Sequence, residues 1–235
     1  MHEIWLGDSK ELCSVLPFGS VNCIVTDPPF GIDATSNQAV TERGQKYARK
    51  IANDKTPEIA IGVFNEVMDI LLPRTADQCD LYVFSSWQVV DHWVPCVKAL
   101  SRHGFVYKNM LIWEKSGSSM GDLNSWGTSY EIIYFLKKGA RKRTDTRRHG
   151  VINFAQLPSG SLIHPHEKPE GLLEILLRHS TSEGDLVVDP FGGSGSLVRA
   201  ARNLGRDGIA MELNEENYHK AVRSLEQSDG LFAAG

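Results

Sequence analysis

Four consecutive residues, Asp27-Pro28-Pro29-Phe30, bring together a carboxylate, two residues that lack a backbone N–H and an aromatic ring. They follow the apolar run 21–26, which predicts a buried strand, so they would lie where that strand reaches the rim of a sheet. Proline fixes its own φ and biases the residue before it toward an extended backbone, which makes the segment stiff. A stiff segment with a carboxylate at one end and a flat ring at the other suits a planar ligand that carries an amine.

The exocyclic amino group of adenine or cytosine fits this description, but it is a poor nucleophile because its lone pair is delocalised into the ring. The Asp27 carboxylate and the Pro28 carbonyl could each accept one N–H hydrogen bond from it. This would turn the lone pair toward an electrophile and stabilise the charge that develops on nitrogen. Phe30 could stack on the base, which would have to be flipped out of a duplex. The alternative is a strand that ends in a Pro-Pro turn, with Phe30 filling the core.

A second motif lies far along the chain. Residues 185–204 predict a buried strand, a glycine-rich loop and a helix, in that order. Glycines let the backbone approach a ligand and a helix N-terminus favours an anionic group, so this arrangement predicts a nucleotide-type cradle. Residues 208–212 predict the next strand. Its last residue, Glu212, falls 20 residues after Gly192, where a ligand of a ribose hydroxyl belongs.

A dinucleotide oxidoreductase is the competing interpretation of this loop. Its fingerprint requires Gly-x-Gly-x-x-Gly or Ala, whereas this chain has Gly193-Ser194-Gly195-Ser196-Leu197-Val198. The third small residue is absent, which argues against the close packing of a pyrophosphate site. A glycine loop alone is weak evidence, but a glycine loop with a spaced glutamate, in the same chain as Asp-Pro-Pro-Phe, is strong evidence for a different class.

Together the motifs resemble the amino-directed DNA methyltransferases, which use S-adenosylmethionine. The order, with the catalytic motif before the cofactor loop, resembles their circularly permuted (beta-type) group. The resemblance covers nearly the whole chain. The matching segments are Gly7-Asp8-Ser9, Asp27-Pro28-Pro29-Phe30, Ser85-Ser86-Trp87, Trp113-Glu114-Lys115, His164-Pro165-His166-Glu167-Lys168-Pro169, Asp189-Pro190-Phe191-Gly192-Gly193-Ser194-Gly195 and Glu212.

The resemblance implies S-adenosylmethionine as the cofactor and assigns residues to it. The catalytic residues would be Asp27, Pro28, Pro29 and Phe30. The cofactor-binding residues would be Asp8, His164, Lys168, Pro169, Asp189, Pro190, Phe191, Gly193, Gly195 and Glu212. Asp8 would touch the adenine of the cofactor, with a turn-forming role as the equal alternative. Lys168 would meet either the cofactor carboxylate or a phosphate.

Ser85, Ser86 and Trp87 would line the base pocket by the same resemblance, with a core position as the alternative for Trp87. His164 and His166 invite a metal interpretation, but no third and fourth ligand occurs at a useful spacing, so we expect no metal. The resemblance instead places residues 164–169 beside the cofactor, where they would cap the helix that follows. A turn bounded by prolines is the alternative.

Asp-Pro-Pro with an aromatic residue is most often associated with adenine N6 in this family. The resemblance therefore implies site-specific methylation of a flipped adenine in double-stranded DNA, without a covalent enzyme intermediate. Phe30 stands where many relatives have Tyr, so a phenolic hydrogen bond is lost while stacking is kept. The alternative acceptors are cytosine N4, RNA or a protein side-chain amide. A non-catalytic nucleic-acid-binding module on the same fold is disfavoured, because both motifs are intact.

The net charge of the chain is −4, but its charges are unevenly distributed, and one segment is strongly basic. Residues 137–149 hold seven Lys or Arg and one Asp, so the segment carries +6 and the rest of the chain −10. A basic segment on an acidic body predicts phosphate contacts whose affinity falls steeply with salt. The predicted contacts there are Arg141, Lys142, Arg143, Arg147 and Arg148. A solvated loop that only aids solubility is the alternative.

Residues 31–57 form a second candidate contact segment, with little periodicity and several cations. Long loops in compact domains tend to be functional lids or disordered, so we expect a mobile loop that closes over DNA and the flipped base. Its predicted contacts are Arg43, Lys46, Arg49 and Lys50. A plain connector is the alternative. Residues 139–163 are the short candidate for target recognition, because no longer region is free for it.

Composition fits one globular α/β domain over residues 1–235, with 41% hydrophobic and 23% charged residues. The four cysteines, Cys13, Cys23, Cys79 and Cys96, are scattered in mostly apolar runs, which is typical of reduced core residues in a cytoplasmic protein. No Cys-x-x-Cys pair supplies the ligands of a zinc deaminase. We find no signal peptide or membrane-spanning stretch, and expect no membrane partner. Relatives are frequently homodimers, but the sequence holds no evidence for one.

Strands alternating with helices predict a doubly wound, mostly parallel sheet. Strands are expected at 3–6, 21–26, 80–85, 105–113, 130–137, 185–190 and 208–212, and helices at 59–72, 89–100, 169–180, 197–204 and 215–226. The pair 105–113 and 130–137 would be antiparallel, and the end from Gly230 would fray. The resemblance adds a seven-stranded, Rossmann-like methyltransferase sheet. Ligands of open α/β sheets lie beyond the carboxyl ends of strands, so Asp27 and Asp189 should share one rim.

Overall fold

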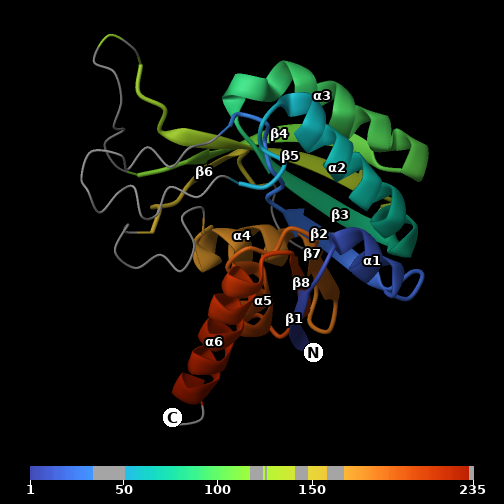
Figure 1. Cartoon of the computed structure of the whole chain (residues 1–235), viewed down its shortest axis with the longest axis vertical. Coiled ribbons are helices and arrows are strands. Elements are labelled where there is room, and N and C mark those ends of the chain that lie inside the picture. The colour runs from blue at the N-terminus through green and yellow to red at the C-terminus, as the bar shows by residue number, and fades with distance from the viewer. Residues whose placement is uncertain (34–50, 117–123, 125, 141–147, 158–166, 233–235) are drawn as a thin grey trace.

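The computed structural model describes residues 1–33, 51–116, 124, 126–140, 148–157 and 167–232. Strands and helices alternate along much of the chain (Figure 1). In chain order they are β1 His2–Leu6, α1 Ser9–Ser14, β2 Val21–Thr26, α2 Pro57–Leu71, β3 Thr75–Ser85, α3 Val90–Ala99, β4 Val106–Glu114, β5 Tyr130–Lys138, β6 Val151–Asn153, α4 Glu170–Ser180, β7 Leu186–Asp189, α5 Ser196–Asn203, β8 Asp207–Glu212 and α6 Glu215–Phe232. Short 3-10 turns follow α2 and α3 and precede α3.

Among the residues that the structure describes, one sheet has eight strands in the order β1-β8-β7-β2-β3-β5-β4-β6. All neighbouring strands are parallel except β5, which runs antiparallel to both β3 and β4. This confirms the mostly parallel class and the expected antiparallel pair. The expected number of seven strands is wrong, because Val151–Asn153, too short to show a sequence period, pairs with β4 at the sheet edge. The circular permutation stays a prediction.

Helices cover both faces of the sheet. α1, α2 and α3 pack on one face and α4, α5 and α6 on the other (Figure 1). The first core contains Phe64 of α2 and Trp93 of α3, whose ring centroids are 5.1 Å apart. The second core lies under α4 and α5 and includes Leu172 and Leu197. Because the sheet is buried on both faces, its central strands are almost continuously apolar, as β2 is.

Local sequence explains the helix boundaries that matter for the site. Thr56 caps α2 through a hydrogen bond from the Ile59 N–H to its hydroxyl, and Pro57 occupies the first turn, where no N–H partner is needed. α3 continues through Pro95, as predicted. α6 extends to Phe232, so residues 230–232 are helical, and the expected fraying of this end stays a prediction. The short helix α1 was not predicted. Within the described residues, no helix is both long and apolar enough to cross a bilayer.

Candidate active site

The two sequence motifs lie at the carboxyl ends of neighbouring strands. Asp27 directly follows β2, and Asp189 is the last residue of β7, which pairs with β2 in parallel. The Thr26 hydroxyl donates a hydrogen bond to Asp189 Oδ1 over 2.9 Å, and both side chains are buried. This contact joins the end of β2, directly before the Asp-Pro-Pro-Phe segment, to the end of β7, directly before the glycine loop, across 163 positions of sequence. The expected common rim is present.

The glycine loop turns tightly between β7 and α5. The Gly192 N–H donates to the Met211 carbonyl of β8 over 2.7 Å, and a Cβ at Gly192 would lie 2.8 Å from Ala210 Cβ. Gly195 has φ +70°, and a Cβ there would lie 2.7 Å from Ile4 Cδ1. Side chains are excluded at both positions, so the loop can expose backbone to a ligand at the N-terminus of α5.

Three carboxylates gather at this rim, from β2, β7 and β8. Burial and, to a smaller extent, the charges of Asp27 and Glu212 raise the pKa of Asp189, while hydrogen bonds from the Phe191 N–H and the Thr26 hydroxyl lower it, and the net pKa is about 7. Burial also raises the pKa of Glu212, which accepts a 2.7 Å hydrogen bond from the Asn214 N–H. Carboxylates that repel one another at a partly desolvated rim favour a cationic ligand.

The structure places the other predicted cofactor residues near this rim. Asp8 follows β1, next to β8, and its carboxylate caps α1 by accepting the Lys10 N–H over 2.9 Å. The turn-forming interpretation of Asp8 is thus present in the structure, and its contact with a cofactor stays a prediction. Pro190 is buried, and its carbonyl accepts a hydrogen bond from the Ser9 hydroxyl. Phe191 is partly buried against the first core.

Asp54 and Trp93 hold the backbone at the end of the Asp-Pro-Pro-Phe segment. Asp54 is 3% exposed, and its Oδ1 accepts the Phe30 N–H over 2.8 Å and the Gly31 N–H over 2.6 Å. The Trp93 indole donates to the Phe30 carbonyl over 3.0 Å. Gly31 has φ +86°, and a Cβ there would lie 2.3 Å from Pro57 N, so only glycine fits. The Phe30 ring packs partly against both cores.

Lys168 lies against the carboxylate of Asp27, which follows β2. Its ammonium is 2.6 Å from Asp27 Oδ2 and 3.3 Å from Glu131 Oε2. Lys115 Nζ is 2.5 Å from the other oxygen of Glu131. The sequence predicted a contact between Lys168 and the cofactor, and the structure shows its charge engaged by these two carboxylates.

Comparison with known proteins agrees with this geometry. The DNA methylase family (N6_N4_Mtase), which uses S-adenosylmethionine as methyl donor, matches residues 21–223. The chain belongs to this DNA methylase family. It is 43% identical to the type II methyltransferase M.HpaI of Haemophilus parainfluenzae, over 91% of this chain and 70% of that protein. It is 24% identical to the DNA adenine methyltransferase YhdJ of Escherichia coli K12, over 94% of this chain and 81% of that protein.

Solved structures show the same fold. TTHA0409 of Thermus thermophilus, in complex with S-adenosyl-L-methionine, superposes with a TM-score of 0.68 at 20% identity, covering 97% of this chain and 95% of that one. As a member of the family, the protein is a DNA methyltransferase of the N6-adenine or N4-cytosine type.

Several predicted residues of this methylase lie outside the described residues. They are His164, Arg43, Lys46, Arg49, Lys50, Arg141, Lys142, Arg143 and Arg147, with most of the loop 31–57 and of the segment 139–163. Arg148 is described and exposed. Pro169 is buried and stands directly before α4. In the described part of the chain, no group of three or more His, Cys, Asp or Glu side chains could hold a metal ion.

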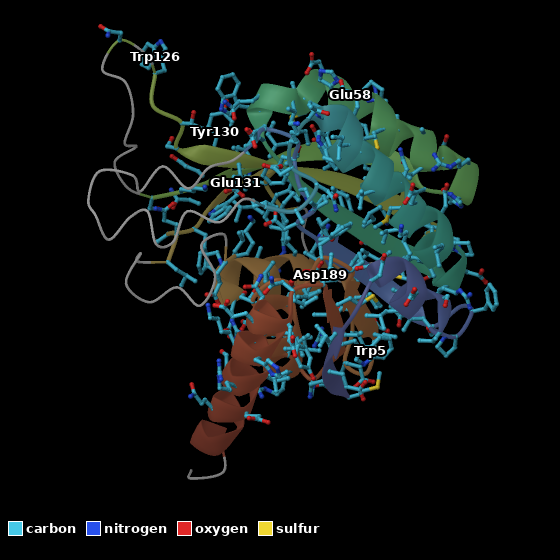
Figure 2. All side chains as sticks on the ribbon, in the orientation of Figure 1. Trp5, Glu58, Trp126, Tyr130, Glu131 and Asp189 are labelled. Carbon is cyan, nitrogen blue, oxygen red and sulfur yellow. The ribbon has the colours of Figure 1, made fainter. Side chains whose placement is uncertain are left out.

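The β3 end of the rim carries residues of this methylase that differ in exposure. Ser85 is fully buried, whereas Trp87 is 47% exposed and donates to the Thr128 hydroxyl over 3.2 Å. The core alternative for Trp87 is therefore wrong. Trp126 is 99% exposed and projects from the body of the fold (Figure 2).

Sequence reasoning missed Asp54, Glu131 and the partner of Lys115. Asp54 follows a long polar segment and carries no local signal, because only the fold reveals that its carboxylate is buried. Glu131 is the second residue of β5, so a search limited to residues that end strands at the carboxyl rim does not include it. The resemblance included Lys115 as part of Trp113-Glu114-Lys115 without giving it a role. The ion pairs that Glu131 makes with Lys115 and Lys168 are revealed only by the three-dimensional structure.

Proposed function

We propose that this methyltransferase transfers a methyl group from S-adenosylmethionine to the N6 amino group of an adenine flipped out of double-stranded DNA. The observation that carries the proposal is the hydrogen bond between Thr26 and Asp189, which joins the ends of the two strands that lead into the acceptor motif and the glycine loop. A methyl donor and a base need to meet within bonding distance, and adjacent parallel strands supply such a meeting place. The relatives are bacterial, which supports a cytoplasmic location.

The residues at the rim fit the proposed cofactor. S-adenosylmethionine supplies an activated methyl group on a positively charged sulfur, and it also carries an ammonium group and ribose hydroxyls. Asp189 and Glu212 offer carboxylates for the cationic and hydroxyl groups, and Asp8 and Phe191 lie beside them. Gly193 and Gly195 leave the backbone accessible. The raised pKa of Asp189 fits a carboxylate whose charge is stabilised when a cation binds.

The catalytic segment supplies acceptors and a flat ring. The Asp27 carboxylate and the Pro28 carbonyl accept the amino hydrogens of the base, which orients its nitrogen lone pair and stabilises the charge that develops there. Phe30 provides the stacking surface, and Asp54 and Trp93 fix its backbone. A covalent thiol mechanism has no support, since all four cysteines are buried and burial raises the pKa of Cys13 to about 12.

Adenine is favoured over cytosine N4 by the Asp-Pro-Pro-aromatic motif and by the likeness to a DNA adenine methyltransferase of Escherichia coli. The family model covers both acceptors, so a direct chemical identification is required.

The test is to incubate the purified protein with S-adenosylmethionine and DNA from a methylase-deficient host, and to digest the DNA to nucleosides. We expect N6-methyldeoxyadenosine from the wild type and a loss of about 100-fold or more in Asp27→Ala, because the amino group loses its oriented acceptor. Cofactor affinity should be nearly unchanged in that variant. N4-methyldeoxycytidine would refute the adenine assignment, and loss of cofactor affinity in a folded Asp27→Ala protein would contradict the separation of the two half-sites.

A further inference from the structure

Four side chains of alternating charge lead from the catalytic carboxylate to the protein surface. The order is Asp27, Lys168, Glu131 and Lys115, with nearest N–O distances of 2.6, 3.3 and 2.5 Å. Their side chains are 22%, 9%, 19% and 25% exposed, so the lysine beside Asp27 is the most buried of the four. The charges sum to zero.

Lys168 is enclosed by the fold. It lies just before α4, and its ammonium is 5.1 Å from the centroid of the Phe84 ring, on β3. Burial alone would lower the pKa of Lys168, but the charges of Asp27 and Glu131 outweigh burial and raise it above its usual value. The pKa of Glu131 is lowered, since Lys168 and Lys115 together overcome its burial. Lys168 and Glu131 are therefore ionised near neutral pH.

The reversed direction of β5 brings Glu131 to this rim. β5 begins at Tyr130, and Glu131 pairs with Trp113 near the end of β4, while Ile132 pairs with Ser85 at the end of β3. The first residues of an antiparallel strand thus lie level with the last residues of its neighbours. Figure 2 shows Glu131 on the β5 side of the rim and Asp189 on the β7 side.

We propose that Lys168 and Glu131 are positioning residues for methyl transfer: Lys168 orients the Asp27 carboxylate and keeps it charged, and Glu131 restrains the Lys168 ammonium. This inference rests on the proposed function. The charges of Asp27 and of Glu212 both act on Asp189 of β7, so like charges meet at this rim and a cation beside Asp27 offsets their repulsion. A protonated Asp27 would lose part of its acceptor capacity for an amino group.

Glu131 limits how strongly the lysine engages the catalytic carboxylate. An ammonium shared between two carboxylates withdraws less electron density from each than an ammonium bound to one. Without Glu131, Lys168 would bind Asp27 alone and weaken it as a hydrogen-bond acceptor. The two residues therefore act on Asp27 in opposite senses, although both support the same reaction.

Four variants test this division: Lys168→Met, Lys168→Arg, Glu131→Gln and, as matched control, Lys220→Met. Lys220 makes a similar ion pair, 2.9 Å from Glu216, on the distant helix α6. The measurements are the single-turnover rate of methyl transfer at saturating S-adenosylmethionine between pH 5 and 9, and the dissociation constant of that cofactor by calorimetry. Thermal unfolding checks that each variant is folded.

Lys168→Met should reduce the rate about 100-fold, because the cation beside Asp27 is gone. The acidic limb of the profile of rate against pH should move upward by about one pH unit. Lys168→Arg should recover part of the rate. Glu131→Gln should reduce the rate about 10-fold and move the acidic limb downward, because the undivided ammonium favours ionised Asp27. Cofactor affinity should change less than about threefold throughout. If the two residues only stabilised the fold, the acidic limb of the pH profile would not move upward in Lys168→Met and downward in Glu131→Gln.

An unchanged rate and pH profile in both Lys168→Met and Glu131→Gln would overturn the inference while leaving the proposed function intact. Loss of cofactor affinity in Lys168→Met would also overturn it and return Lys168 to the cofactor. If Lys168→Met does not fold, the pH profile of Glu131→Gln tests the inference: a downward shift of its acidic limb supports it, and an unchanged profile overturns it. If the wild type methylates no DNA, the proposed function fails. The ion pair is then tested by the unfolding midpoints of Asp27→Asn, Lys168→Met and the double variant, where additive changes would refute it.

Discussion

At the scale of single residues, the site depends on ion pairs between residues that are far apart in the sequence, so the sequence alone does not show which charges are partners. The motifs Asp27-Pro28-Pro29-Phe30 and Asp189 through Gly195 could be predicted because each is contiguous and combines rare residue types. Glu131 and Asp54 could not, since a lone acidic residue is usually solvated and only tertiary structure shows which one is enclosed. The ion pairs of Lys168 with Asp27 and Glu131 had no sequence signal for the same reason, because an ammonium binds whichever carboxylate the fold presents. The contact of Lys168 with the cofactor stays a prediction.

Asp189 gives a prediction on pH and stability. Its folded pKa of about 7 exceeds the 3.8 of an unperturbed aspartate, so the folded state binds the proton more tightly than the unfolded state. Stability from this group is complete below about pH 4 and is lost as pH rises through about 7. The free energy of unfolding of Asp189→Asn minus that of the wild type should therefore increase by about 2 kcal/mol as pH rises from 5 to 8. Denaturant unfolding at several pH values measures it, and a pH-independent difference would contradict it.

At the scale of secondary structure, the rim combines the ends of parallel strands with the start of a reversed one. Long periodic segments such as α2 and buried runs such as β2 were predictable from hydrophobic pattern. α1 and β6 were not, because six and three residues are too few to establish a period. β3 begins at Thr75 rather than Asp80, since its polar first half pairs at the sheet margin without an apolar signal.

The connection between β2 and α2 yields a second prediction. Asp54 accepts hydrogen bonds from the backbone N–H groups of Phe30 and Gly31. It therefore holds the two ends of this connection together and also fixes the backbone of Phe30, the proposed stacking residue. Asp54→Ala should lower the free energy of unfolding by about 2–4 kcal/mol, because buried donors lose their acceptor. Asp54→Asn, which keeps one acceptor oxygen, should lose less. Unfolding curves and methyl-transfer rates measure both effects, and equal losses in the two variants would exclude an acceptor role.

At the scale of the whole molecule, the basic segment 137–149 begins on the side of the sheet away from the reaction. Lys138 pairs with Cys79 in the first half of β3, and its ammonium donates to the Thr75 hydroxyl over 3.1 Å. β6 then pairs in parallel with the end of β4, so the chain has returned to the reaction rim by Val151. Exposed Arg148 therefore lies within three residues of that rim, which favours the later cations of the segment as DNA contacts.

Salt dependence tests this distribution. Replacing Arg147 and Arg148 by Ala should weaken binding to duplex DNA and reduce the slope of log affinity against log salt by about 0.9 for each phosphate that the protein no longer neutralises. The matched control replaces Lys220 and Arg223, on α6, by Ala and should leave the slope unchanged. Fluorescence anisotropy over a series of salt concentrations measures both. Equal slopes in all three proteins would assign this pair of arginines to solubility alone.

The hairpin between β4 and β5 has an implication for how such enzymes diversify. The Lys115 N–H donates to the Ser129 carbonyl over 2.7 Å, which closes the ladder just before the connection leaves the sheet. Extra sequence inserted between these two positions would leave the strand pairing intact and would start next to Lys115, which reaches Asp27 through Glu131 and Lys168. Grafting loops of different length there is thus a direct way to give one catalytic framework new reading preferences for DNA.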